Sequence, residues 1–488
     1  MVSNTTPISQ DMRKRPYWTP ATIIFIALQA GVMCYLLLFS LSNSFSVRIV
    51  LALVVYMIST FLFIWVAKKE FYDLHEQLIF YFIVYFLFSI FSLKAVCVFT
   101  CPKLFWPGIY KFNTSTIAHA YFIFLAGYIP FFTGYLIWGK NRNPNINTAL
   151  NSKLYEQEID ESYVVPTTSL IFICIIGISL KAFSLYFLQI GDPNVLPTRI
   201  QVPYLTGIIY FICTSGLLFL LTVLLILTAV KRRFFLFGIG LALLLIFTIL
   251  DLSVGWKSPL LYFPLIIGFV TYACYRRHIK SIYRPLTIGL IALSLIGVNA
   301  YVGIQHYRYL RISGKADLSN SPNVIFSASA AENIASIITR FGGFEQLVTV
   351  LSYIESHPEF KRLGFAAMWG NEATEFYTHK LIGSSKQSKT SYSSNQWGQF
   401  YLSLGIWGVI AGMFVVGIIM RLVQKIFLDN CHMPLLRDSI VPAIFLLNRR
   451  IFSGTGEFIY LAKYILILWI CFWFTRRILG DKNIHSRF

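Results

Sequence analysis

Long apolar runs, separated by short polar segments, follow one another along most of the chain. A helix of about 20 apolar residues is long enough to cross the hydrocarbon core of a bilayer. The runs therefore predict an all-α polytopic membrane protein with about twelve transmembrane helices. Their approximate ranges are 21–41, 46–67, 77–98, 117–138, 164–190, 203–230, 233–251, 258–274, 285–303, 397–420, 438–452 and 458–475.

The composition supports this interpretation of the pattern. Of the 488 residues, 56% are hydrophobic and 13% are charged, whereas a soluble domain is about 25% charged. Such a chain has too little polar surface to cover a water-soluble fold. The first apolar run follows Arg13-Lys14-Arg15 and has no small-residue cleavage site after it. We therefore expect a retained first helix rather than a signal peptide.

The positions of Lys and Arg predict how the helices are oriented. If the N-terminus is cytoplasmic, 22 of the 41 basic residues fall in segments on the cytoplasmic side, as the positive-inside rule requires. Both termini are then cytoplasmic, and most of the net charge of +20 orients the chain instead of binding nucleic acid. The inner segments carry 13–15, 68–69, Lys140, Arg142, Lys153, 231–233, 276–277, Lys280, Arg284, Arg421, Lys425, Arg437, 476–477, Lys482 and Arg487.

One long hydrophilic segment lies on the outer side, between the ninth and tenth predicted spans. It runs from about His306 to Gln396 and contains helix-like stretches at 327–356 and 366–381. A loop of this length without structure of its own would be uncommon in a compact domain. We therefore divide the chain into membrane helices 1–303, an outer loop subdomain 304–396, and membrane helices with a cytoplasmic tail 397–488.

The usual motifs of metal-assisted or ATP-driven chemistry are missing from the sequence. It contains no DxD pair, no HExxH helix, no Walker loop and no nucleophile elbow. The eight cysteines are scattered and show no zinc-like spacing. We expect neither a metal site nor a cofactor.

Cationic and aromatic residues on the outer side are the remaining candidates, because the positive-inside rule gives no reason for them. Lys257 and Trp256 lie on a short turn before a predicted helix, where an anion site can form. A snorkelling lysine beside an interfacial tryptophan is an equal alternative. A helical continuation of the ninth span would carry His306, Tyr307, Arg308 and Arg311 above the membrane, and Arg449-Arg450 precede the last span.

The stretch "SIITRFGGFEQLV" combines an apolar helical pattern with Arg340, a Gly342-Gly343 pair and Glu345. On a continuous helix, Glu345 would lie on the apolar face, where an unpaired carboxylate costs several kcal/mol. Either the glycines break the helix or Glu345 has a partner. An amphipathic helix lying on the membrane with one surface arginine is the plainer alternative.

Four passages resemble the bacterial O-antigen and oligosaccharide repeat-unit polymerases (Wzy-type). They are "DLSVGWKSPLL", "TRFGGFEQLV", "SSNQWGQFYLSLGIWGVIAGMFVVGIIMRLV" and the Arg449-Arg450 region, all in the last two-thirds of the chain. The resemblance implies a GT-C-like, metal-independent glycosyltransferase of the bacterial inner membrane with a periplasmic loop. It would polymerise undecaprenyl-diphosphate-linked oligosaccharides among membrane lipids, with a chain-length regulator protein as a partner.

The resemblance also suggests roles for the candidates. Diphosphate binding falls to Arg340, Arg308, Arg311 and Arg449, with Lys257 and Arg450 behind them, because guanidinium groups bind phosphate oxygens in bidentate fashion. Glu345 leads as the catalytic base beside Arg340; His306 and His357 are weaker alternatives. Trp256, Tyr307 and Trp397 are candidate contacts for sugar or lipid.

Two other functions stay open at this stage. An O-antigen ligase would share the topology and the donor but transfer the glycan to lipid A-core. A polysaccharide transporter or lipid flippase would also need many spans. The long hydrophilic segment argues against a major-facilitator carrier, which would have its central loop in the cytoplasm.

Overall fold

The computed structural model describes residues 47–71, 74–84, 88, 114–137, 167–188, 208–210, 212–253, 259–277, 279–312, 344–381, 395–429, 434–452 and 458–478, with isolated positions between 27 and 38. Of these residues, 92% are helical and none lies in a strand. At 300–312 and 449–452, the description covers the backbone alone. The fold is an α-helical one, as the apolar pattern predicted.

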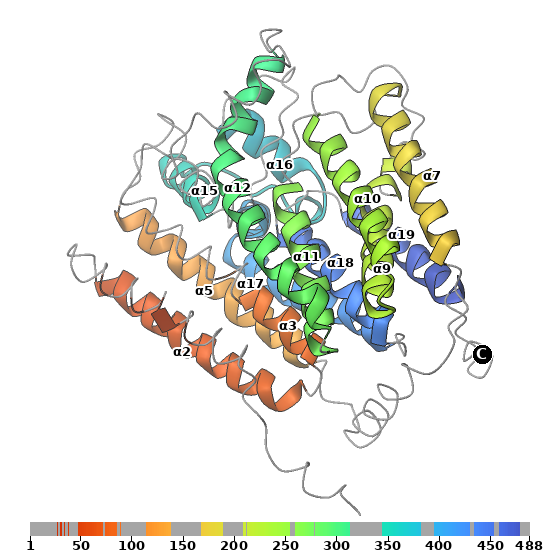
Figure 1. Ribbon diagram of the computed structural model, residues 1–488. Coiled ribbons are helices and arrows are strands. Elements are labelled where there is room, and N and C mark those ends of the chain that lie inside the picture. Colours follow the sequence, from red (N-terminus) through yellow and green to blue (C-terminus); the bar gives the residue numbers. More distant parts are fainter. Residues whose placement is uncertain are drawn as a thin grey trace, which may run out of the picture.

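The helices before the hydrophilic segment are mostly long and apolar (Figure 1). They are α2 (Val47–Glu70), α3 (Leu74–Phe82), α5 (Thr114–Ile137), α7 (Thr167–Tyr186), the π-helix η4 (Ile212–Gly216), α9 (Leu217–Val230), α10 (Phe234–Ser253), α11 (Pro259–Arg276) and α12 (Lys280–Ile312).

Shorter elements follow, and then three long helices. The short elements are α15 (Phe344–Ser356), the 3-10 helix η6 (Ala366–Met368), α16 (Glu372–Phe376) and the π-helix η7 (Tyr377–Leu381). The long helices are α17 (Asn395–Asp429), α18 (Pro434–Phe452) and α19 (Phe458–Ile478). The stretch 366–381, expected as one helix-like piece, is therefore divided into three short elements.

Six helices in the described part of the chain are long and apolar enough to cross a membrane. The protein is thus a multi-pass membrane protein. The six are Val47–Ala67, Ser115–Ile137, Thr167–Tyr186, Ile208–Val230, Phe234–Ser253 and Asn395–Asp429, with shorter apolar helices at Tyr262–Tyr275 and Tyr464–Thr475. The other predicted spans remain predictions, and the run 21–41 falls mainly outside the described residues.

Glycines bring α5 and α17 into close contact along much of their length. A Cβ added at Gly134 would lie 2.3 Å from the Phe414 carbonyl oxygen, and one at Gly417 would lie 2.1 Å from that of Phe131. No side chain fits at either position without moving a backbone. Gly134 and Gly417 therefore allow the two helices to approach closely, as small residues do at membrane helix interfaces.

Helix α9 lies at the centre of the second half of the bundle. Its sequence, "LLFLLTVLLILTAV", is apolar on every side, and nearly all of its residues are buried. A helix that is hydrophobic all round belongs in an interior, and α9 contacts α7, α10, α11, α18 and α19.

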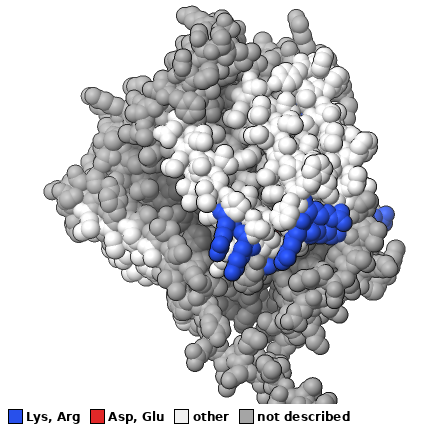
Figure 2. Space-filling model, in the orientation of Figure 1, with Lys and Arg blue, Asp and Glu red and all other residues white. Residues whose placement is uncertain are grey.

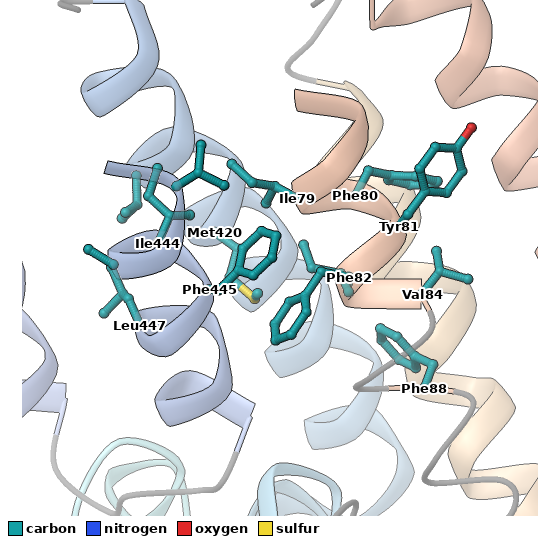
Figure 3. Close-up of a cluster of buried hydrophobic side chains, with 14 of the residues drawn as sticks. Ile79, Phe80, Tyr81, Phe82, Val84, Phe88, Met420, Ile444, Phe445 and Leu447 are labelled. Atoms are coloured by element: carbon teal, nitrogen blue, oxygen red, sulfur yellow. The ribbon is translucent and has the colours of Figure 1, made fainter. Parts of the chain in front are cut away.

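The short helix α3 packs beside α18 (Figure 3). The Phe82 and Phe445 rings stack with centroids 4.1 Å apart. Met420 of α17 and Ile444 and Leu447 of α18 belong to the same buried cluster. Apolar packing of α3 and α17 around α18 thus joins the α5–α17 pair to the helices around α9.

The bundle has two ends, which we call the loop end and the opposite end. The loop end carries α15 and α16 (Figure 1), whereas the opposite end carries the exposed basic residues Arg232, Arg233, Lys280 and Arg284. Figure 2 shows Lys and Arg gathered at the lower edge of the described surface, with no Asp or Glu on this face. The α9–α10 connection and the α11–α12 connection, both predicted inner loops, thus lie at the same end.

Arg421 corrects one part of the charge interpretation. The sequence placed it among the orienting residues of an inner loop, but α17 continues to Asp429 and Arg421 is only 1% exposed. The guanidinium lies over the Phe71 ring, with its central carbon 4.5 Å from the ring centroid. Arg421 therefore belongs to the interior of the bundle and is not one of the solvent-exposed loop residues that orient the chain.

Candidate functional site

Most of the residues singled out from the sequence lie at the edge of what the structure describes. Arg340, Trp256 and Lys257 lie outside the described residues. Helix α12 continues to Ile312, so the backbone at His306, Tyr307, Arg308 and Arg311 is helical as predicted. Arg449 and Arg450 belong to the last turn of α18. Nothing in the described contacts brings these residues together.

Glu345 and Trp397 are described in full. Glu345 is half-buried in the first turn of α15, the end of a helix where a carboxylate is favourable. Trp397 is 1% exposed, and its Nε1 donates to the Phe124 carbonyl oxygen over 3.2 Å. The Trp397 ring packs against Phe88 and Phe124, so the structure gives it a packing role rather than a surface on which a sugar could stack.

The structure reveals a break in α17 that the sequence did not indicate. Gly405 has φ 68° and ψ −147°, which lies outside the helical region and is readily adopted only by glycine. In an unbroken helix, the carbonyls of residues 401, 402 and 403 would accept hydrogen bonds from residues 405, 406 and 407. The break therefore requires other donors for these carbonyls.

Residues 362–364 supply those donors. The backbone N–H groups of Leu363 and Gly364 donate to the carbonyls of Leu402 and Ser403 over 3.1 and 3.0 Å. Nη1 of Arg362 donates to the Tyr401 carbonyl over 2.8 Å. The Arg362 guanidinium carbon also lies 4.5 Å from the centroid of the Tyr401 ring, a cation–π contact. The strap 362–364 thus fixes an exposed arginine beside the break.

A histidine–carboxylate pair also lies beside Tyr401. Nδ1 of His119, on α5, is 3.1 Å from Oε1 of Glu355, on α15, and each side chain is 42% exposed. The Thr116 hydroxyl donates to Oε2 of Glu355 over 2.6 Å. The His119 ring meets the Tyr401 ring edge-on, with centroids 6.2 Å apart.

Large apolar side chains are exposed next to these polar groups. Phe365 follows the strap and is 68% exposed, and Trp407 follows the break and is 75% exposed. The loop-end cluster, defined as Thr116, His119, Glu355, Arg362 and Tyr401, therefore combines water-accessible charged side chains with exposed apolar side chains close by in the chain.

The sequence analysis did not select this cluster. His119 lies in an apolar predicted span, and an ionisable residue at such a position is itself a reason to suspect function. Glu355 and Arg362 looked like ordinary loop charges. They join His119 only because α15 packs on α5 and α17, a contact between distant segments that no local pattern contains.

A second polar group near the loop end is buried. Nζ of Lys181, on α7, is 2.7 Å from Oδ1 of Asp251, on α10, and the Tyr262 hydroxyl donates to Oδ2 over 2.7 Å. The lysine nitrogen also lies 3.3 Å from the Phe247 ring centroid. Asp251 stands next to the predicted turn of Trp256 and Lys257, but here its carboxylate balances a buried lysine.

Three further ion pairs lie inside the opposite end of the bundle, two of which share the Asp438 carboxylate. The Asp438 carboxylate on α18 contacts Nε2 of His75 and Nη1 of Arg277, both at 2.7 Å. Nearby, Nη2 of Arg421 is 3.5 Å from Oε1 of Glu76. Buried charges of this kind need partners because isolated ions are costly in an apolar interior.

Metal binding finds no support in the described part of the chain. No group of three or more His, Cys, Asp or Glu side chains there is placed to hold an ion. No protein-family model, curated protein or solved structure matches this chain. The case for its function therefore rests on its own residues.

Proposed function

We propose that the protein is an integral-membrane glycosyltransferase that uses a lipid-diphosphate-linked glycan as its donor. The reaction would extend a surface polysaccharide by joining undecaprenyl-diphosphate-linked repeat units at the loop end. That end would face the periplasm, because the exposed basic residues of the opposite end fit a cytoplasmic face.

The loop-end cluster is the observation that carries the proposal. It places His119, Glu355 and Arg362 within reach of water, and the exposed Phe365 and Trp407 follow the strap and the break directly or within two residues in the chain. A substrate with a charged head, sugars and a polyprenyl tail needs these two surfaces side by side. His119 and Arg362 both contact the Tyr401 ring, so a group that can accept a proton and a group that can bind an anion are neighbours of the same side chain.

Arginine chemistry supports a diphosphate as the charged group. Arg362 is exposed at the break in α17, and the predicted diphosphate residues Arg308, Arg311 and Arg340 belong to the same outer segment. Guanidinium groups hold phosphate oxygens and can stabilise the negative charge that develops on a leaving diphosphate. The donor bond itself would supply the energy of transfer, without nucleotide.

Reconstitution with a purified lipid-linked repeat unit tests this proposal. We expect a ladder of longer glycans without added nucleotide or metal. Arg340→Ala should abolish the ladder with protein levels unchanged, while Arg284→Ala, at the opposite end, should retain it. Transfer to lipid A-core instead of to a second repeat unit would identify a ligase. An absence of any new glycosidic bond would overturn the transferase proposal.

Transport is the second candidate, and the buried ion pairs favour it. Ionisable residues inside membrane helices often mark substrate or proton pathways, and Lys181–Asp251 and Arg421–Glu76 lie inside the bundle. In vesicles, transport would move the intact lipid-linked unit across the bilayer. A product with unchanged glycan length on the far side would support the transporter.

A further inference from the structure

We propose that His119 is the general base of the transfer reaction and that Glu355 is its positioning residue. The inference rests on the proposed function and assigns a residue that the sequence did not select. Three features support it: the contact of His119 Nδ1 with Glu355, the hydrogen bond from Thr116 to the same carboxylate, and the residues that pack around the pair.

The contact with Glu355 determines the protonation pattern of the neutral His119 ring. An ionised carboxylate can only accept, so Nδ1, at 3.1 Å from Oε1, carries the proton. The lone pair of neutral His119 is then on Nε2, on the far side of the ring. This orientation is the one in which a carboxylate prepares a histidine to accept a proton.

The carboxylate is held from α5 as well. Thr116 and His119 are three residues apart on α5 and therefore lie on the same helix face. The Thr116 hydroxyl donates a hydrogen bond to Oε2 of Glu355 over 2.6 Å, and His119 donates one to Oε1. Glu355 stands in the last turn of α15, where the helix dipole disfavours a negative charge. These two donors compensate for that position.

Packing between the helices maintains the distance within the pair. The rings of Tyr121 on α5 and Phe344 on α15 have centroids 5.1 Å apart, and Phe344 is fully buried. The other described neighbours of His119 are Tyr401 of α17 and, through their shared contact with the Tyr401 ring, the guanidinium of Arg362. Glu355 is the only carboxylate among these neighbours in the described part of the chain.

The chemical step balances without a further reactant. Nε2 of His119 accepts the proton of the acceptor sugar hydroxyl as the hydroxyl oxygen forms a bond to the anomeric carbon of the donor. The bond from that carbon to the diphosphate oxygen breaks, and its electron pair leaves with the lipid diphosphate. The imidazolium then releases the proton to water, to which the side chain is open.

The test uses the full-length protein in proteoliposomes with the lipid-linked repeat unit. His119→Gln and Glu355→Gln are compared with His379→Gln, whose histidine belongs to the π-helix η7 and has no part in the proposed site. We expect His119→Gln to lower the rate about 10²- to 10⁴-fold, the range for loss of a general base. His379→Gln should leave the rate unchanged.

Two readouts separate a chemical role from a structural one. Added imidazole should restore part of the rate of His119→Ala, because it can occupy the vacated space and accept the proton. The decline of the wild-type rate towards acid pH should be lost in His119→Gln and displaced in Glu355→Gln. A purely structural contact would show neither effect.

The outcomes distinguish this inference from the proposed function. Ladder formation by wild type and by His119→Gln at equal rates would overturn the inference and leave the function standing. No ladder from wild type would overturn both. If His119→Gln fails to fold, a Glu355→Gln variant with the wild-type rate and pH profile would overturn the inference.

Discussion

Two histidine–carboxylate pairs described in the structure lie at opposite ends of the bundle, and they differ in almost every physical respect. His75–Asp438 is buried, with side chains 3% and 2% exposed, and Arg277 contacts the second carboxylate oxygen. His119–Glu355 is 42% exposed on both sides, and its second carboxylate oxygen is taken by the neutral Thr116 hydroxyl. The same two residue types thus form a closed pair and an open pair.

The difference shows that environment assigns the role. In the closed pair, the arginine compensates the carboxylate charge and apolar helices exclude water, so the contact joins α3, α11 and α18. In the open pair, no cation balances Glu355 among its described contacts except the histidine itself when protonated. Water can reach the imidazole. The closed pair contributes to stability, and the open pair is the one to which we assign a chemical role.

Removing the carboxylate of the closed pair should have the largest effect. Asp438→Ala would leave Arg277 and His75 without their shared partner in a buried site. The loss of one member of a buried ion pair costs about 3–5 kcal/mol. Detergent-solubilised Asp438→Ala should unfold at a much lower denaturant concentration than wild type. Equal loss in Glu355→Ala would contradict the distinction between closed and open pairs.

Lys181→Met tests whether an ion pair stabilises the fold because it is buried or because of the end of the bundle at which it lies. The Lys181–Asp251 pair is near the loop end but buried, so we expect it to behave like His75–Asp438. The single substitution leaves Asp251 with only the Tyr262 hydroxyl among its described contacts and should cost about 3 kcal/mol. Lys181→Met combined with Asp251→Leu should recover most of that loss. A double variant less stable than Lys181→Met would refute this explanation.

Gly405→Ala tests how far the open pair depends on the break in α17. A residue with a side chain at φ 68° costs about 1–3 kcal/mol, so the melting temperature should fall and Tyr401 should shift beside His119. Gly238→Ala is the matched control, because a Cβ at Gly238 meets nothing within 4 Å. In Gly405→Ala, the loss of transfer rate, expressed as a free energy, should exceed the loss of unfolding free energy. An unchanged rate would separate the break from the site.

The smallest effect concerns Lys231, in the turn between α9 and α10. Partial burial, and then the nearby Arg233, lower the pKa of Lys231. Protonation of this lysine therefore disfavours the folded state slightly, and the penalty fades as pH rises and the folded form loses its proton first. Lys231→Gln should be slightly more stable than wild type at neutral pH, with the difference closing in alkaline buffer. A constant difference across pH would contradict this assignment.

The sequence predicted the helices more completely than their contacts. Apolar runs located α5, α7 and α10 because each crosses the bilayer core with little polar interruption. The partners within each pair lie 363 residues apart for His75–Asp438 and 236 for His119–Glu355. Such contacts depend on which helices are neighbours, and hydropathy does not contain that information. For the same reason, Arg421 looked like an orienting charge, although it is buried against Phe71.

The break at Gly405 was also beyond sequence reasoning. "SLGIWGV" has several glycines, and nothing local distinguishes Gly405 from Gly408 or Gly412. The former adopts a left-handed backbone, whereas the latter two face close packing with Phe400. The described helix α15 has Phe344 as its first residue, so Glu345 occupies its N-terminal turn, whereas the glycine pair lies outside the described residues.

The strap on α17 has a consequence for how the protein is made. Arg362 precedes Tyr401 by 39 residues, so the donors of the strap are synthesised before the carbonyls that they satisfy. In lipid, those carbonyls would find no water to replace the missing helical bonds. The span therefore cannot reach its final hydrogen-bonded state until residues 362–364 have docked on it. Docking of the strap is in this way a step in the folding of α17.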